Sequence, residues 1–369
     1  MIYLVTFFSS FLFLRLSEMK LKNCTKSAKL IFVIIGLLLP TLLAAARDIG
    51  VGTDVRVYGY NVFSVATKSA HFSDMDYLGK WYQIEFGYRG INFVISRFTD
   101  NIFWVLGTIE LFILVLVYQA LKYYREKICA EFSISWGMLI FYFLFYNETL
   151  NLLRQSMAIA VVLFAFRYIH QRKVVRYCIW VIVSMQFHIT AVIALVLYPI
   201  YYWIVIKEKK RLLFWIAIGC MAGGIILPYL IKIVIQTGIL GEKFNRYLSI
   251  GESTLSITQL IIRIPFVLCL LYLVKKNRIE EKMTNYWVVL LLMDFAFAEL
   301  RASLSTLYRI SLYFSWFKMQ AYYEIVRGSL RTNRKIVSWS LVLFFLALWW
   351  YQSIYIGNNG TYPYSFGMR

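Results

Sequence analysis

Charged residues are scarce in this chain, at 16% of its 369 residues, whereas hydrophobic residues make up 60% and aromatic residues 18%. A soluble domain of this length carries more charge on its surface. The composition therefore excludes an ordinary soluble enzyme and predicts an all-α polytopic membrane protein, whose apolar segments of about 20 residues cross the bilayer as helices. No soluble domain is evident, and we interpret residues 1–369 as a single transmembrane domain.

Cysteine and histidine are also rare, with five and three residues. The cysteines are scattered and odd in number and no C-x-x-C occurs, so neither a disulfide framework nor a zinc site is indicated. Phosphate-binding Gly-Lys loops, dinucleotide fingerprints, H-E-x-x-H and G-x-S-x-G are all missing, which removes support for ATP-driven, nicotinamide-linked, zinc-protease and hydrolase functions. Acidic residues between 48 and 76 lack a fixed ligand spacing, which favours a solvated loop. We predict no cofactor and no metal site.

The Lys and Arg residues follow a pattern along the chain. The net charge of +20 could indicate nucleic acid, but the basic residues fall mostly in short clusters between apolar segments. Such clusters orient membrane helices with their basic loops inside, so we predict no nucleic-acid partner.

Residues 47–100 break the apolar pattern and form the long outer loop. We expect about twelve transmembrane helices, at residues 2–14, 20–46, 102–121, 132–146, 212–235, 257–274, 286–300, 304–325 and 336–356, with three more in 147–199.

The core motif region, residues 147–199, places polar side chains inside membrane-length apolar sequence. On one continuous helix, Asn147, Asn151, Arg154, Gln155 and Ala158 would form a single polar stripe. A charge left in hydrocarbon costs at least ~2.5 kcal/mol, so we expect Arg154 at a helix end or beside a cavity. The alternative is an arginine that merely extends from a helix end to the membrane surface.

The spacing of two basic clusters predicts a broken helix in the same region. About 30 residues separate Arg176 from Lys207, or about 45 Å of helix, which is long for one crossing and short for two. We therefore expect two shortened helices that meet at residues 186–188, with His188 at the break. The alternative role of His188 is a buried neutral imidazole that bonds Ser184 one turn back.

A second group of cations is predicted near residue 305. Arg301, Ser305 and Arg309 share one helical face, about 12 Å from end to end, and two cations there could bind a diphosphate. The alternative for Arg301 is a local pair with Glu299 or Asp294 near the outer membrane surface.

Four sequence blocks in this order resemble the EpsG family of polysaccharide polymerases: ARDIGVGTDVRVY, IEFGYRGINFVI, NLLRQSMAIAVVLFAF and QFHITAVIALVLYP. The matching residues are Arg47, Gly52-Thr53-Asp54 and Tyr58, then Glu85-Phe86-Gly87, then Arg154-Gln155 with Ala158, and then Phe187-His188. Tyr308-Arg309 and the terminal Tyr362-Pro363-Tyr364 also fit. The resemblance covers most of the chain, and Gln186 departs from it by replacing the small residue expected before Phe-His.

The resemblance implies a Wzy-like glycosyltransferase that joins repeat units linked to undecaprenyl diphosphate, during capsule or exopolysaccharide assembly. It implies an active site on the outer face of the bacterial cytoplasmic membrane, and a chain-length regulator and a flippase of the same pathway as partners. Arg154 and Arg309 would stabilise diphosphate charge, and His188 would be the base. The substrate-binding residues that we predict are Arg47, Asp54, Tyr58, Glu85, Asn151, Gln155 and Arg301. A flippase or a glycan ligase of related chemistry is the alternative.

Overall fold

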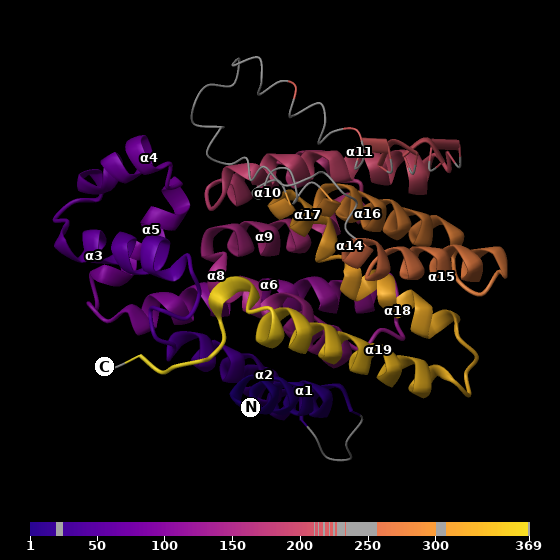
Figure 1. Ribbon diagram of the computed structural model, residues 1–369, viewed down its shortest axis with the longest axis horizontal. Helices are drawn as coiled ribbons and strands as arrows, with labels where there is room; N and C mark the ends of the chain where they lie inside the picture. The colour runs from indigo at the N-terminus through magenta and orange to yellow at the C-terminus, as the bar shows by residue number, and fades with distance from the viewer. Residues whose placement is uncertain are drawn as a thin grey trace. The chain divides into compact units, whose positions relative to one another are not determined.

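The computed structural model describes residues 1–19, 25–209, 257–299 and 308–367, with scattered positions between 211 and 233 (Figure 1). The regular secondary structure of the described residues is helical, and an isolated antiparallel β-bridge joins Arg47 and Phe366. The all-α prediction is confirmed.

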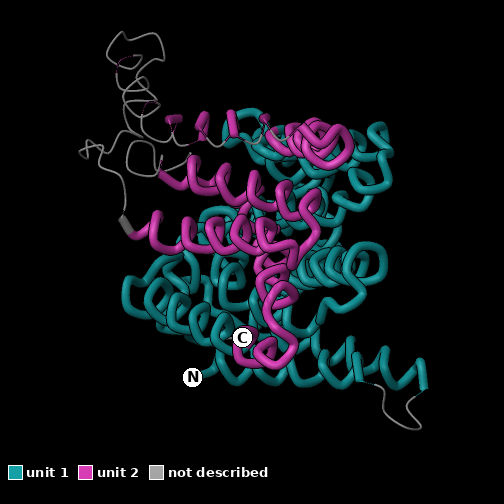
Figure 2. The backbone as a smooth tube through the Cα atoms, turned by 90° about the vertical axis from the view of Figure 1, so that its right-hand side faces the viewer, with its two compact units in different colours: residues 1–192, 339–369 teal, residues 193–338 magenta. Residues whose placement is uncertain are grey.

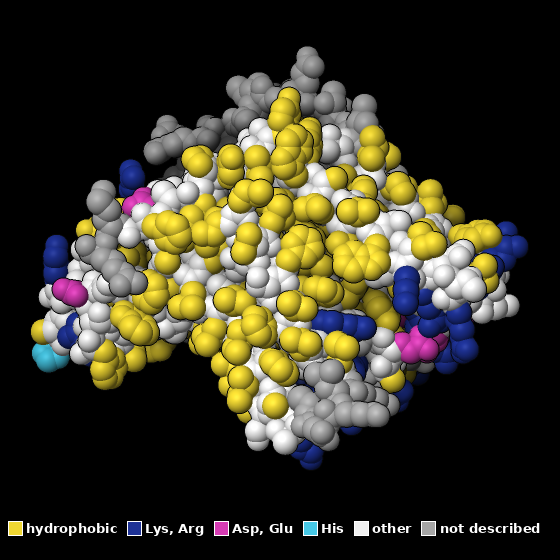
Figure 3. All heavy atoms as spheres, turned by 90° about the horizontal axis from the view of Figure 1, so that it is seen from below, with side chains coloured by type: hydrophobic (Ala, Val, Ile, Leu, Met, Phe, Trp, Pro, Cys, Tyr) yellow, Lys and Arg dark blue, Asp and Glu magenta, His cyan; other side chains and the backbone are white. Residues whose placement is uncertain are grey.

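Five helices of the described ranges are long and apolar enough to cross a membrane. They span Lys26–Ala45, Ile102–Lys127, Ile189–Ile206, Thr258–Lys275 and Arg334–Tyr355. Each has at least 18 residues, or about 27 Å of helix, close to the ~30 Å hydrocarbon core. Hydrophobic side chains cover most of the face seen in Figure 3. These features indicate a membrane protein, whereas the number of about twelve helices stays a prediction.

The chain divides into two compact units, which Figure 2 colours separately. Unit 1 contains residues 1–192 and 339–369, and unit 2 contains residues 193–338.

Unit 1 is built on a row of helices that pack in the order α1, α2, α6, α9 and α10. Thr25 caps α2 by accepting from Ala28 N at 3.1 Å, and Asn101 caps α6 by accepting from Phe103 N at 2.9 Å. These side chains satisfy amides that have no partner inside the helix. The bounds are α1 Ile2–Glu18, α2 Lys26–Ala45, α6 Ile102–Lys127, α7 Ile134–Phe141, α8 Asn147–Asn151, α9 Leu153–His170, α10 Val174–Met185 and α19 Arg334–Trp349.

Two breaks interrupt the core motif region. Between α10 and a 3₁₀ helix at Ile189–Val196 lie residues 186–188, so the predicted break at His188 is confirmed. The second break was not expected: Leu152, with φ −85° and ψ 55°, separates α8 from α9. The prediction of one continuous polar stripe is therefore wrong, because Asn147 and Asn151 lie on one helix and Arg154, Gln155 and Ala158 on the next.

Most of the predicted outer loop is helical. Its elements are a π-helical segment Val55–Tyr60, α3 Asn61–Lys68, a 3₁₀ turn Phe72–Met75, α4 Asp76–Tyr82 and α5 Phe86–Ser96. Arg89 of α5 donates to Met75 O at 3.0 Å and to the Asp76 carboxylate at 2.8 Å. Side-chain contacts within residues 47–100 thus fold this segment into a compact layer that supports the residues preceding α5.

The C-terminal tail packs on the start of the outer segment. Gly52 N donates to Gly360 O at 2.8 Å, and Asp48 N donates to Ser365 O at 2.9 Å. Inside the unit, Asn147 donates to Thr361 Oγ1 and accepts from Trp349 Nε1, both at 2.7 Å. These bonds connect α8, the end of α19 and the tail.

Unit 2 is organised around α16, Glu281–Glu299, which packs against α15 Ile264–Lys275, α17 Tyr308–Ser315 and α18 Lys318–Gly328. Shorter elements are α11 Leu197–Tyr201, a π-helical segment Tyr202–Ile206 and α14 Ile257–Ile261. A single helix over 304–325 is wrong, since residues 316–317 separate α17 from α18. Residues 300–307 and most of the predicted helix 212–235 lie outside the described residues.

Candidate active site

Arg154 lies in the first turn of α9, immediately after the break at Leu152. Its Nη1 donates to the Glu85 carboxylate at 2.6 Å and to Gln83 O at 3.2 Å. The guanidinium stacks on the ring of Tyr58, with Cζ 4.1 Å from the ring centroid. Its side chain is only 12% exposed. Arg154 therefore stands at a helix end, as the sequence predicts, but it is held between two segments and does not extend freely to the surface.

Glu85 links Arg154 to the turn that carries His188. One carboxylate oxygen accepts from Arg154, and the other accepts from Ile189 N at 3.1 Å. Both bonds come from donors that stabilise a charged carboxylate, one a cation and one a backbone amide at the start of a helical segment. The two breaks of the core motif region are thus connected through one side chain.

Backbone contacts hold the same two segments together. Gly87 N donates to Gln186 O at 2.8 Å. A Cβ on Gly87 would lie 2.8 Å from that oxygen, so only glycine allows this approach. Burial raises the pKa of the neighbouring Tyr88, and the Arg154 charge opposes this only in part. The hydroxyl of Tyr88 accordingly stays protonated and donates to Tyr58 O at 2.8 Å.

His188 lies in the turn after α10, half-buried. Its Nδ1 lies 2.6 Å from Thr190 Oγ1, and Thr190 N donates to the same nitrogen at 3.3 Å. The Ser184 hydroxyl donates to Ala158 O at 2.8 Å, so the described bonds of the His188 ring are to Thr190, and the alternative bond to Ser184 stays a prediction.

Asn151 and Arg47 stabilise the backbone around the break at Leu152. The Asn151 amide oxygen accepts from Asp54 N at 2.8 Å and from Thr53 Oγ1 at 3.1 Å. Arg47 is buried and donates to Leu150 O at 3.1 Å, and Gly52, at φ +99°, leaves no room for a side chain beside that oxygen. These contacts stabilise the backbone next to the break, and the substrate-binding role of Arg47 and Asn151 stays a prediction.

A sequence model of the EpsG family matches residues 29–366, nearly the whole chain. The chain belongs to the EpsG family. This is a Wzy-like polymerase family, and membership suggests a role in polysaccharide polymerisation. Searches of curated proteins and of solved structures returned no match.

The motif blocks that resemble the EpsG family meet in unit 1. Tyr58 from the first block, Glu85 from the second and Arg154 from the third are in contact, and Ile189 joins them next to His188 of the fourth. We call Tyr58, Glu85, Arg154 and His188 the Arg154 site. The first three are in direct contact and provide an aromatic face, a carboxylate and a cation, and His188 directly precedes Ile189, whose amide bonds the carboxylate. A cation and a proton acceptor are the groups that acid–base chemistry beside an anionic leaving group requires.

Other predicted residues have different surroundings. Gln155 is buried in α9, and Asp54 is half-buried in the turn that Asn151 holds. Arg309 lies in α17 of unit 2, so whether it faces Arg154 stays a prediction. Arg301 and Ser305 lie outside the described residues.

Unit 2 contains a buried charge cluster that was not predicted from the sequence. Asp294 of α16 is fully buried and pairs with Arg263 Nε at 2.6 Å and Lys318 Nζ at 2.7 Å, while Arg263 also donates to Gln259. Asp294 is thus engaged from two sides. Two basic residues inside apolar segments were the available signal, since buried charges require partners.

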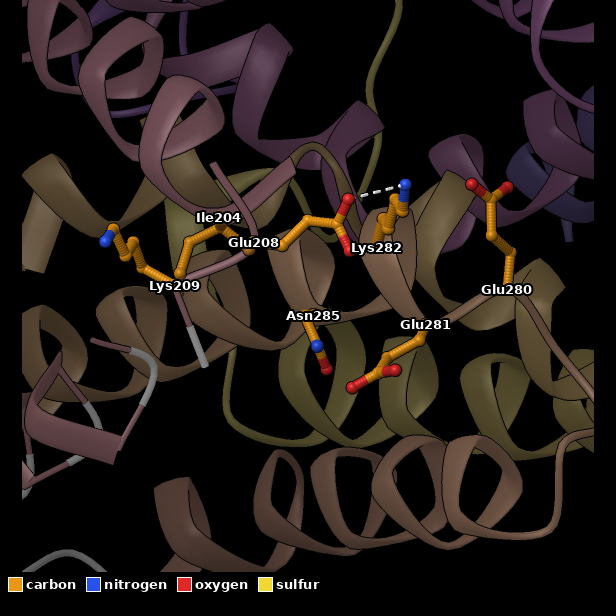
Figure 4. A pocket seen from close by; sticks show the side chains of 7 residues that line it. All are labelled: Ile204, Glu208, Lys209, Glu280, Glu281, Lys282 and Asn285. Atoms are coloured by element: carbon orange, nitrogen blue, oxygen red, sulfur yellow. Dashed lines mark ion pairs between the residues drawn. The ribbon is translucent and has the colours of Figure 1, made fainter. Parts of the chain in front are cut away.

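A cavity of about 130 Å³ lies elsewhere in unit 2, lined by Ile204, Glu208, Lys209, Glu280, Glu281, Lys282 and Asn285. Figure 4 shows Lys282 directed toward Glu208, with which it forms an ion pair at 2.7 Å. The lining includes none of the predicted site residues. Across the described ranges, no group of three or more His, Cys, Asp or Glu side chains is placed to hold a metal.

Proposed function

We propose that this EpsG-family protein joins oligosaccharide repeat units carried on undecaprenyl diphosphate, at the outer face of the bacterial cytoplasmic membrane. The observation that carries the proposal is the Arg154 site, where the motif blocks bring together a largely buried guanidinium and a carboxylate that bonds residues after two helix breaks of a membrane protein. A lipid-linked substrate reaches such a site from the bilayer.

The proposed reaction mainly requires charged side chains at the correct positions. In a sugar linked to a diphosphate the leaving group is already good, so the enzyme must stabilise developing negative charge and remove the proton of the acceptor hydroxyl. The two described bonds of Arg154 use Nη1, which leaves Nε and Nη2 to donate to phosphate oxygens. Arg309 is the second cation of the proposal, and Tyr58 and Asp54 are its sugar-binding residues.

A deletion strain tests this function against its alternatives. Loss of a polymerase should leave single lipid-linked repeat units outside the cytoplasmic membrane. Loss of a flippase would strand them inside, and loss of a ligase would leave long chains on the lipid carrier. The observation of either of these patterns would contradict the proposal.

A further inference from the structure

The cavity of unit 2 lies just beyond the ends of two membrane-length helices. Glu208 of its lining follows the span Ile189–Ile206, and Glu280 follows the span Thr258–Lys275. The side chains of Glu208 and Lys282 are about half exposed, so the cavity reaches the surface. It therefore lies at the level where membrane helices leave the hydrocarbon core and meet the lipid headgroups.

Aromatic and basic side chains at both span ends support this level. Tyr202 is exposed, and Lys207 Nζ lies 5.6 Å from the centroid of its ring. At the end of α15, Tyr272 is exposed in the same way, with Lys276 Nζ 5.9 Å from its ring centroid. Exposed tyrosines accompanied by lysines are typical of the headgroup region of membrane proteins.

Asn285 of α16 is a buried polar side chain that lines the cavity. It is 8% exposed, and Figure 4 shows its amide directed into the space between the lining side chains. Among the residues that the structure describes, this amide has no hydrogen-bond partner. Burying an amide without a hydrogen bond is unfavourable, which indicates a ligand that supplies the missing bond.

The charges of the lining favour a cation. Three glutamates and two lysines give it one more negative than positive charge: Glu208, Glu280, Glu281, Lys209 and Lys282. Glu208 and Lys282 form an ion pair at 2.7 Å. Figure 4 shows the ammonium of Lys209 directed away from the carboxylates, so the interior of the cavity attracts positive charge.

The acceptors and the volume restrict the kind of cation. Glu281 and Asn285 lie one turn apart on α16, and Figure 4 shows their polar ends directed toward one another. A carboxylate oxygen and an amide oxygen can both accept from one ammonium group, which has three N–H donors. Because a cavity of ~150 Å³ holds a molecule of benzene, about 130 Å³ is enough for a two-carbon ammonium group but too small for a sugar repeat unit.

We propose that this cavity binds the primary ammonium group of a membrane lipid headgroup, as in phosphatidylethanolamine. The ammonium donates to the Asn285 amide oxygen and to the Glu281 carboxylate. The phosphate of the same headgroup stays at the surface, where Lys209 can pair with it, so the zwitterion matches a lining that carries both signs of charge. Phosphatidylcholine has no N–H donor for Asn285, and phosphatidylglycerol has no cation for the glutamates.

Native mass spectrometry of the full-length protein in detergent measures this selectivity. Phosphatidylethanolamine, phosphatidylcholine and phosphatidylglycerol with identical acyl chains are titrated separately, and the affinity of the first bound lipid is compared. We expect phosphatidylethanolamine to bind at least about tenfold more tightly than the other two, because a hydrogen bond to a charged group is worth that factor or more.

Two substitutions test the residues that hold the ammonium. Asn285→Leu should weaken phosphatidylethanolamine binding by about tenfold or more, and Glu281→Gln should do the same. In lipid-free detergent, Asn285→Leu should keep or raise the thermal stability, because it removes a buried amide that has no partner. Glu126→Gln is the matched control, since it removes an exposed carboxylate of α6 outside the cavity, and it should leave lipid binding unchanged.

Equal affinity for the three lipids would overturn the proposal. So would an Asn285→Leu variant that binds phosphatidylethanolamine like the wild type, since the cavity would then hold only water. Two soluble competitors distinguish other sources of the cation. Displacement of the lipid by equimolar phosphoethanolamine would assign the cavity to a soluble amine, and displacement by N-acetylarginine amide would assign it to a basic side chain of a partner protein. Either displacement would contradict a lipid site.

Discussion

Replacing Arg154 by lysine should disable the protein almost as severely as replacing it by alanine. In the structure the guanidinium bonds Glu85 and Gln83 O through one nitrogen and stacks on Tyr58 through its face. A lysine ammonium can keep the charge and one bond, but it has no planar fork for two phosphate oxygens. Charge alone should therefore not restore activity.

The expected magnitude follows from the contacts. A donor that bonds developing anionic charge is worth about 10² to 10³ in rate, or ~2.7–4 kcal/mol. The stacking on Tyr58 adds ~0.5–2 kcal/mol to the placement of the guanidinium. We expect Arg154→Lys and Arg154→Ala to lose at least 10² in turnover, and both to bind the lipid-linked donor more weakly.

The assay is turnover per folded molecule, measured beside donor affinity and thermal stability for the wild type and both variants. Arg167→Lys, at the other end of α9, is a suitable control because Arg167 also stacks on an aromatic ring, with Cζ 3.7 Å from the centroid of Phe164. Near-normal turnover of Arg154→Lys would refute the reasoning, since it would reduce Arg154 to a charge at the membrane surface.

Three further predictions concern other parts of the chain. Asp294→Ala should lower the free energy of unfolding by ~3–5 kcal/mol, because it leaves two buried cations without their shared carboxylate. Glu126 is exposed, so Glu126→Ala should change that free energy by less than ~0.5 kcal/mol. Thermal unfolding in detergent compares the two variants. Polymerisation should be insensitive to EDTA, since arginines supply the charge compensation, and rescue by added magnesium or calcium after chelation would contradict this. Cysteine labelling of intact cells should reach residues 47–100 and 242–252 from outside but not residues 20–29, 207–211 and 327–335, and labelling of the latter from outside would reverse the predicted orientation.

Composition and spacing predicted the helical class and the break at His188, because both follow from apolar length and from where basic clusters can lie. The break at Leu152 could not be predicted from spacing. It depends on contacts across the fold, in which Arg47 and Asn151 bond the backbone around residues 53–54 and 150. The helical period of 3.6 residues therefore predicted one helix that continues past Leu152, where the structure has a break.

The site was predicted as a set of residues but not as a network. The motif blocks named Glu85, Arg154 and His188 separately, and no pattern in the sequence shows that Glu85 bonds both Arg154 and Ile189 N. This network arises from the tertiary contact between residues 85–88 and 186–189.

Reconstitution tests the central claim most directly. Purified protein in proteoliposomes, supplied only with a lipid-linked repeat unit of defined structure, should convert it to a ladder of longer lipid-linked chains and release undecaprenyl diphosphate in proportion to the bonds formed. Arg154→Ala should leave nearly all of the repeat unit unchanged. Movement of the repeat unit across the bilayer with no new glycosidic bond would contradict the account.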